Sequence, residues 1–164
     1  DTVESIIDLV LETKEDILSK QNVEKQIKQV DENQSQNMMS GNEKNYEALL
    51  KKTIDSSFGR IEFDVNGKIL DVNSNFATMM GYNDVNELIG RHHSLFVELE
   101  YKLSEEYEHF WMDLANGITQ EGVFQRYSQQ GKQVWIQSSY TPLLNEDGSV
   151  IRIIKVATDV TGNK

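Results

Sequence analysis

Residues 60–72 read RIEFDVNGKILDV, and this stretch decides the fold. Apolar residues alternate with charged ones up to Asn66-Gly67, a dipeptide that two-residue hairpin turns favour because both turn positions need a positive φ. The pattern therefore predicts a strand over residues 60–65, a tight turn, and an antiparallel partner strand over residues 68–72.

Toward the C-terminus the chain predicts one clear helix and three more strands. Ser104 is a typical N-cap for a helix over residues 104–116, whose apolar side chains recur at helical spacing. Turn residues separate three runs that predict strands at about 119–128, 132–144 and 149–158. Strands and helices that segregate along the chain in this way indicate an α+β fold, a five-stranded antiparallel sheet with helices on one face.

The N-terminal part of the chain predicts a long helix that precedes this sheet. Residues 3–20 carry apolar side chains at helical spacing, whereas Gly41-Asn42 indicates a break before a second, short helix over residues 43–55. We therefore expect a helical linker or dimerisation segment over residues 1–44 and a globular domain over residues 45–164. A solvated linker and a dimeric coiled coil both stay open, because the chain holds too few clean heptads to decide between them.

Charge and composition argue against several classes of function. The formal net charge of −11 argues against nucleic-acid partners and against direct contact with an anionic membrane surface. The absence of cysteine excludes disulfides, thiolate metal sites and a cysteinyl-flavin adduct. No catalytic triad, phosphate-binding loop or metal-ligand spacing occurs, so we expect neither an enzyme nor a metal site.

The location is expected to be cytoplasmic. No apolar run approaches the ~20 residues that span a bilayer, and no signal-peptide pattern is visible. The chain starts at Asp1, so a longer, membrane-anchored receptor stays open.

The order of the predicted elements and their motifs resembles a PAS domain over about Phe58 to Thr161. The motifs that carry the resemblance are Ile61-Glu62-Phe63-Asp64, Asn66-Gly67, Ile69-Leu70-Asp71-Val72-Asn73, Met80-Gly81-Tyr82, Glu87-Leu88-Ile89-Gly90, Val134-Trp135-Ile136 and Ala157-Thr158-Asp159-Val160-Thr161. A finer resemblance, through Gly90-Arg91-His92-His93 and Phe110-Trp111, is to the cytoplasmic PAS domains of bacterial methyl-accepting chemotaxis proteins, including aerotaxis receptors. The resemblance implies a PAS sensor domain over residues 45–164 that relays a signal to an output domain outside this chain.

The resemblance leaves the cofactor unknown, with haem and FAD both compatible with the family. Flavin-binding relatives carry a cationic run where this chain has Val97-Glu98-Leu99-Glu100, and acidic groups there repel phosphate. His92 and His93 are adjacent and point different ways, so they cannot form one ligand face. The acidic run argues against FAD and the histidine arrangement argues against haem, without excluding either.

Strand alternation and the resemblance together define a candidate binding site. Ile136, Ser138 and Tyr140 share one face of the fourth strand, and the resemblance points that face inward. By the same comparison the third strand contributes inward side chains, and the helices close the site. The predicted cofactor-binding residues are Phe124, Arg126, Ile136, Ser138, Tyr140, Trp111, Met80 and His93. Arg126 either meets an anionic ligand group or forms a salt bridge at the rim of the sheet.

Two functions follow from these expectations. The first is a chemotaxis-type or energy-taxis-type sensor, in which a small ligand or cofactor changes the packing of the helices that lead to an output domain. The alternative is a ligand-free PAS interaction and dimerisation module whose interior is filled by its own side chains. We expect a homodimer through the N-terminal helices, unless their apolar stripe folds back on its own domain.

Overall fold

The computed structural model describes the backbone of residues 2–163 and the side chains of that range except residues 2–13, 16, 34–40 and 163. The chain divides into two compact units, Asp1–Leu50 and Lys51–Lys164. The expected division into residues 1–44 and 45–164 stays a prediction.

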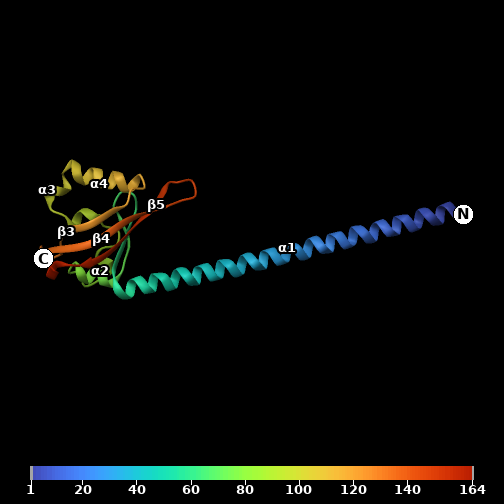
Figure 1. Ribbon diagram of the computed structural model, residues 1–164, viewed down its shortest axis with the longest axis horizontal. Coiled ribbons are helices and arrows are strands. Elements are labelled where there is room, and N and C mark those ends of the chain that lie inside the picture. The colour runs from blue at the N-terminus through green and yellow to red at the C-terminus, as the bar shows by residue number, and fades with distance from the viewer. Residues whose placement is uncertain (1, 164) are drawn as a thin grey trace. The chain divides into compact units, whose positions relative to one another are not determined.

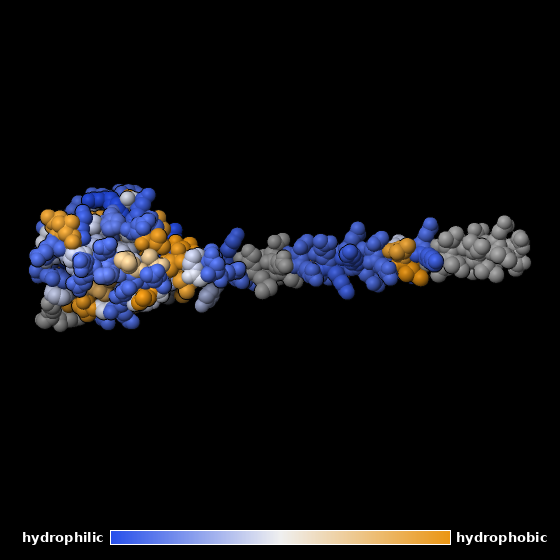
Figure 2. Space-filling model, turned by 90° about the horizontal axis from the view of Figure 1, so that it is seen from above, coloured by the Kyte–Doolittle hydropathy of each residue, from blue (hydrophilic) through white to orange (hydrophobic). Residues whose placement is uncertain are grey.

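A single continuous helix, α1, runs from Thr2 to Ser57. The helix predicted over residues 3–20 is confirmed, but the break predicted at Gly41-Asn42 is wrong, because α1 passes through both residues. One glycine costs a helix only about 1 kcal/mol relative to alanine, and strong helix formers follow it in the sequence. The predicted apolar stripe of residues 3–11 lies outside the described side chains. Elsewhere the described surface of α1 is hydrophilic apart from a few apolar side chains (Figure 2).

The second unit is built on the predicted five-stranded antiparallel sheet, which is confirmed (Figure 1). Its strands are β1 (Gly59–Phe63), β2 (Ile69–Val72), β3 (Gln120–Tyr127), β4 (Gln133–Leu144) and β5 (Val150–Asp159). They lie in the order β2-β1-β5-β4-β3, so the N-terminal hairpin and the C-terminal three-stranded meander meet where β1 pairs with β5. This arrangement makes β5 a central strand that contacts both parts of the sheet.

The helices of the second unit pack on the inner face of the sheet. They are α2 (Ser74–Met79), α3 (Leu99–Lys102) and α4 (Glu105–Ala115), with short 3₁₀ turns at η1 (Val85–Glu87), η2 (His93–Phe96) and η3 (Thr161–Asn163). The predicted helix over 104–116 is confirmed as α4, and its N-cap Ser104 accepts a hydrogen bond from the Tyr107 amide at 3.1 Å. Four residues at i, i+3, i+4 and i+7 of α4 are buried, namely Tyr107, Phe110, Trp111 and Leu114.

The turn of the first hairpin fits against α4 and needs glycine for two reasons. Gly67 has a φ of +87°, which a residue with a Cβ adopts only with strain. A Cβ at Gly67 would also lie 2.7 Å from Nε2 of His92 and 3.1 Å from the Trp111 ring. The predicted two-residue Asn66-Gly67 turn is wrong in detail, because no described residue other than glycine has a positive φ. The Gly67 amide donates to the Asp64 carbonyl at 3.1 Å, so Val65 and Asn66 are the central turn residues, and Gly67 after them lets the turn approach α4 closely.

A buried guanidinium joins the end of α1 to the sheet. Arg60 Nε contacts Asp55 Oδ1 at 2.8 Å, and Arg60 Nη1 contacts Asp71 Oδ2 at 2.9 Å and the Glu62 carboxylate. Arg152 on β5 contacts Glu62 at 3.0 Å. The last turn of α1 and strands β1, β2 and β5 thus share one network of charges.

Candidate ligand site

The inner face of the sheet carries a polar cluster within an otherwise apolar core. Pairing between strands places Ser138 opposite Ala157 and Tyr140 opposite Lys155, with all four side chains buried. Arg126 comes from β3 and is only 3% exposed. His93, the first residue of η2, is fully buried and reaches the same region from the helical side.

The Tyr140 hydroxyl is the centre of this cluster. It accepts hydrogen bonds from Lys155 Nζ at 2.7 Å and from Arg126 Nη2 at 3.1 Å. Nε2 of His93 lies 3.0 Å from the same hydroxyl, and Nδ1 of His93 lies 2.8 Å from the Tyr107 hydroxyl. Five side chains from three strands, η2 and α4 are thereby joined in one hydrogen-bonded chain.

Counting donors and acceptors fixes the direction of this chain. When Lys155 and Arg126 both donate, they use both lone pairs of the Tyr140 oxygen, so its proton is donated to Nε2 of His93. Neutral His93 then carries its proton on Nδ1 and donates it to the Tyr107 oxygen. The Tyr107 hydroxyl proton is left over for another acceptor.

The cluster is cationic and has no acidic partner among the residues that the structure describes. Within the described part of the chain, the hydrogen bonds of the Lys155 and Arg126 side chains go to the Tyr140 hydroxyl and, for Arg126, also to the Gln125 carbonyl at 2.9 Å. The alternative in which Arg126 forms a salt bridge at the rim is therefore not realised. Two buried basic groups without a carboxylate are costly and favour an anion or a carbonyl oxygen nearby.

Burial controls the ionisation of the cluster. It lowers the pKa of the Lys155 ammonium well below its ordinary value, and the neighbouring Arg126 guanidinium acts in the same direction. Burial and the same two cations lower the pKa of His93. The pKa of the Tyr140 hydroxyl is raised by burial, against the opposing effect of Arg126. His93 and Tyr140 are therefore held neutral, and Arg126 is the permanent charge.

Two buried polar atoms beside the hydrogen-bonded side chains of this cluster have no hydrogen-bond partner. They are Nε of Arg126 and Oγ of Ser138. Arg126 and Phe124 also line a hollow of 340 Å³ that is open at the surface between β3 and the segment around Val97 to Tyr101. Two carboxylates, those of Glu98 and Glu106, line the same hollow.

The predicted site residues are brought together to different degrees. Arg126, Tyr140 and His93 share hydrogen bonds, and the Phe124 ring lies 5.4 Å from that of Tyr140 and 5.0 Å from the Arg126 guanidinium carbon. Ile136 and Ser138 are buried on the same inner face, as strand alternation predicted. Trp111 contacts His93 at 5.2 Å but also faces a separate groove, and Met80 is buried in the apolar core.

Two residues of the cluster were not predicted. Lys155 follows Ile153 and precedes Ala157 on the inward face of β5, so strand alternation alone could have found it. Tyr107 was assigned to the apolar stripe of α4, and no local signal indicates that its hydroxyl meets His93.

The described imidazoles are poorly placed to bind haem iron from within the core. Both ring nitrogens of His93 are engaged by tyrosine hydroxyls. Nε2 of His92 lies 2.7 Å from the Asn66 carbonyl, and its Nδ1 accepts from the Ser94 amide at 3.0 Å. His109 is on the exposed side of α4. A large flat cofactor would also have to displace the Tyr140 ring, which contacts Phe110 at 4.9 Å.

Comparisons with known proteins agree with this architecture. Residues 69–157 match the family model described as PAS fold. The biofilm dispersion protein BdlA of Pseudomonas aeruginosa is 34% identical over 107 residues, which make up 65% of this chain and 25% of that protein. The chain therefore spans about a quarter of the length of this curated relative.

Solved structures show the same fold at low sequence identity. The PAS domain of a protein from Colwellia psychrerythraea is 20% identical, has a TM-score of 0.60, and aligns over 70% of this chain and 97% of that one. A light-oxygen-voltage domain studied with a flavin analogue is 21% identical, has a TM-score of 0.58, and aligns over 71% of this chain and 87% of that one.

In the described part of the chain, no helix has the length and apolar character needed to cross a membrane.

Proposed function

The chain belongs to the PAS fold family, and on that premise we propose that it is a signal-transduction sensor domain whose interior cluster binds a small anionic or carbonyl-bearing ligand. The observation that carries the proposal is the pair of unpartnered atoms, Arg126 Nε and Ser138 Oγ, in a cluster whose basic side chains, Arg126 and Lys155, have no acidic partner among the described residues. A buried polar atom left without a partner costs about 1–3 kcal/mol, which a ligand oxygen would recover.

The position of the cluster supports a relay to both ends of the domain. Lys155 lies on β5, the strand that pairs with both β1 and β4. Close to the end of β5, the Asp159 carboxylate accepts from the Thr161 amide at 2.9 Å, and the Thr161 hydroxyl accepts from the Trp135 amide at 3.0 Å. A ligand that moves Lys155 would act on the exit of the chain through this strand.

The other end of the relay is the Arg60 network. Because β1 pairs with β5 and carries Arg60, movement of β5 reaches Asp55 in the last turn of α1. By analogy with chemotaxis receptors, the signal then passes through helices to an output domain outside this chain, in a cytoplasmic homodimer.

The test uses the full chain and two 2-oxo acids as probes, pyruvate and 2-oxoglutarate. An absorption spectrum and native mass spectrometry first show whether a ligand is retained on purification. Calorimetry then compares wild type with Arg126→Gln and with Lys132→Gln, an exposed control on the β3–β4 turn. The site is supported if the affinity for a probe falls at least about tenfold in Arg126→Gln but not in Lys132→Gln, as loss of a charge-assisted hydrogen bond predicts. Equal binding by all three chains would exclude the cluster as the site.

The alternative function, a ligand-free interaction module, rests on a different observation. The Tyr140 ring packs against Phe63, Phe110 and Phe124 at centroid distances of 6.4, 4.9 and 5.4 Å, so the interior is largely filled by its own side chains. A colourless protein that retains no ligand and binds neither probe would favour this module over the sensor.

A further inference from the structure

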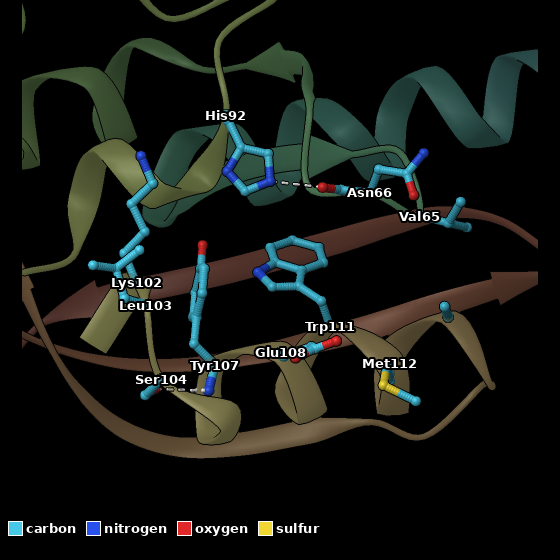
Figure 3. Close-up of a pocket in the computed structure, with 11 residues that line it drawn as sticks. Val65, Asn66, His92, Lys102, Leu103, Ser104, Tyr107, Glu108, Trp111 and Met112 are labelled. Atoms are coloured by element: carbon cyan, nitrogen blue, oxygen red, sulfur yellow. Dashed lines mark hydrogen bonds between the residues drawn. The ribbon is translucent and has the colours of Figure 1, made fainter. Parts of the chain in front are cut away.

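A second hollow lies on the opposite flank of α4 from the Arg126 opening, and neither the fold nor the proposed sensor function uses it. It has a volume of 540 Å³ and lies between α4, the turn of the first hairpin and the segment that joins α3 to α4 (Figure 3). We call it the α4 groove; its lining residues are Val65, Asn66, His92, Lys102, Leu103, Ser104, Tyr107, Glu108, Trp111, Met112 and Ala115.

One buried polar atom in the α4 groove has no partner. Nε1 of Trp111 makes no hydrogen bond, although the residue is only 8% exposed. Burial raises the pKa of the Tyr107 hydroxyl, and the approach of the Trp111 indole N–H lowers it, although the two groups do not meet the geometry of a hydrogen bond. In Figure 3 the indole nitrogen and the Tyr107 hydroxyl lie toward each other beneath His92.

The Tyr107 hydroxyl is a second donor available to the α4 groove. Its oxygen is engaged by His93 at 2.8 Å, and when Lys155 and Arg126 both donate to Tyr140, the proton of Tyr107 has no acceptor among the described residues. Two donors, the indole N–H and the phenolic O–H, therefore converge where one acceptor oxygen could receive both. The Tyr107–His93–Tyr140 chain connects this point to the interior cluster.

The wall of the α4 groove is fixed in place. Nδ1 of His92 accepts from the Ser94 amide at 3.0 Å, so Nε2 carries the ring proton and donates it to the Asn66 carbonyl at 2.7 Å. The ring therefore forms a wall with no donor to spare. The Gly67 turn packs directly on the rings of His92 and Trp111. A preformed site of this kind loses little entropy when a ligand binds.

We propose that the α4 groove is a second ligand site, which takes a small apolar molecule through one carbonyl or carboxylate oxygen that accepts from Trp111 Nε1 and the Tyr107 hydroxyl. The groove also exposes Leu103 and Met112, which give contact for an aromatic or aliphatic body. Lys102 and Glu108 line it with opposite charges, so the acceptor oxygen rather than the net charge of the ligand is the shared requirement.

The experiment follows the indole N–H resonances of the full chain by heteronuclear NMR. The chain has two tryptophans, and Trp111→Phe identifies the resonance that belongs to Trp111. Benzamide and benzoate are the probes, and benzylamine, which has the same ring without an acceptor oxygen, is the control. A saturable shift of the Trp111 resonance with benzamide, benzoate or both supports the proposal, and the pair shows whether a neutral or a charged oxygen is preferred.

Variants test whether the Tyr107 hydroxyl takes part. Tyr107→Phe is expected to weaken the bound probe about threefold to tenfold, as loss of one hydrogen bond predicts. Tyr82→Phe, which changes a buried tyrosine outside the groove, should leave the affinity unchanged. The proposal is overturned if neither oxygen-bearing probe shifts the Trp111 resonance, if benzylamine binds as well, or if Tyr107→Phe binds like wild type. None of these outcomes depends on Arg126, so a failure of this proposal would leave the proposed sensor site at Arg126 to be tested separately.

Discussion

At the scale of single residues, Lys155 is the least expected feature of the domain. Its ammonium is fully buried, lies 4.5 Å from the Tyr140 ring centroid and has no carboxylate partner among the described residues. Replacing an unpaired buried charge by an apolar group of similar length removes its desolvation cost. We expect Lys155→Met to raise the free energy of unfolding by about 1–2 kcal/mol near neutral pH.

The pH dependence of that gain distinguishes a charge effect from better packing. The pKa of Lys155 in the folded protein lies below its ordinary value of 10.5. At pH values between these two pKa values, the unfolded protein binds more protons than the folded protein. Wild type therefore loses stability as the pH falls through this interval. The advantage of Lys155→Met should therefore grow as the pH falls from about 10 and level off below the folded pKa. Urea unfolding across this range measures it, with exposed Lys68→Met as the control. A pH-independent difference would point to packing alone.

Gly67 gives a residue-scale prediction about the α4 groove. Gly67→Ala combines a strained φ of +87° with a Cβ 2.7 Å from Nε2 of His92 and 3.1 Å from the Trp111 ring, so we expect it to cost about 2–3 kcal/mol of unfolding free energy. Gly131 has a similar φ of +77° but no atom within 4 Å of its added Cβ. Gly131→Ala should therefore cost only about 1 kcal/mol, from the backbone strain. Equal losses in urea unfolding would show that the turn does not press on Trp111.

At the scale of elements, the Arg60 network holds the end of α1 to the sheet. Burial alone would raise the pKa values of Asp55 and Asp71, but the hydrogen bonds and charge of Arg60 lower both. Removing Arg60 leaves a buried carboxylate, Glu62, beside two partly exposed ones. We expect Arg60→Gln to cost about 2–3 kcal/mol at neutral pH, less than a fully buried pair would, because solvent screens Asp55 and Asp71.

The sign of the pH effect follows from the lowered carboxyl pKa values. Their contribution to wild-type stability is present above the ordinary value of 3.8 and is lost as the pH falls through the folded pKa values. The difference between wild type and Arg60→Gln should therefore shrink below about pH 4 in urea unfolding. Lys51→Gln, at an exposed ion pair of 3.4 Å, is the control and should cost less than about 0.5 kcal/mol. A difference that persists at low pH would show that Arg60 acts through packing.

The elements that could be predicted are those with local signals. The hairpin of β1 and β2 was predicted from Asn66-Gly67, although the turn is centred one residue earlier, and α4 was predicted from the Ser104 cap and its stripe. Alternation put Ile136, Ser138 and Tyr140 on one face of β4, the family resemblance chose that face as the inward one, and all three are buried. The continuity of α1 was missed because a lone glycine is a weak breaker, and Lys155 was missed because lysine is seldom buried. The contact of His93 with Tyr107 depends on how η2 and α4 pack, which no local pattern encodes.

At the scale of the whole molecule, the expected homodimer rests on the first unit. Val23, Ile27 and Val30 recur at i, i+4 and i+7 of α1 and are 52, 56 and 53% exposed. Apolar side chains at this spacing form one stripe, and a helix whose stripe faces water is marginal by itself. A second copy of the same helix is the simplest partner that would bury the stripe, and polar neighbours such as Lys25 would stay in solvent.

We therefore expect the full chain to sediment as a dimer, and we expect Ile27→Asp to shift it toward monomer. A carboxylate at the centre of the stripe would have to be buried between two helices without a partner, which costs several kcal/mol. Gln26→Asp adds the same charge one residue away, outside that i, i+4, i+7 spacing, and should leave the dimer intact. Analytical ultracentrifugation of the three chains at one concentration and ionic strength makes the comparison. If wild type sediments as a monomer, the proposed relay does not involve a dimer. If both variants dissociate equally, the added negative charge controls assembly and the apolar stripe does not.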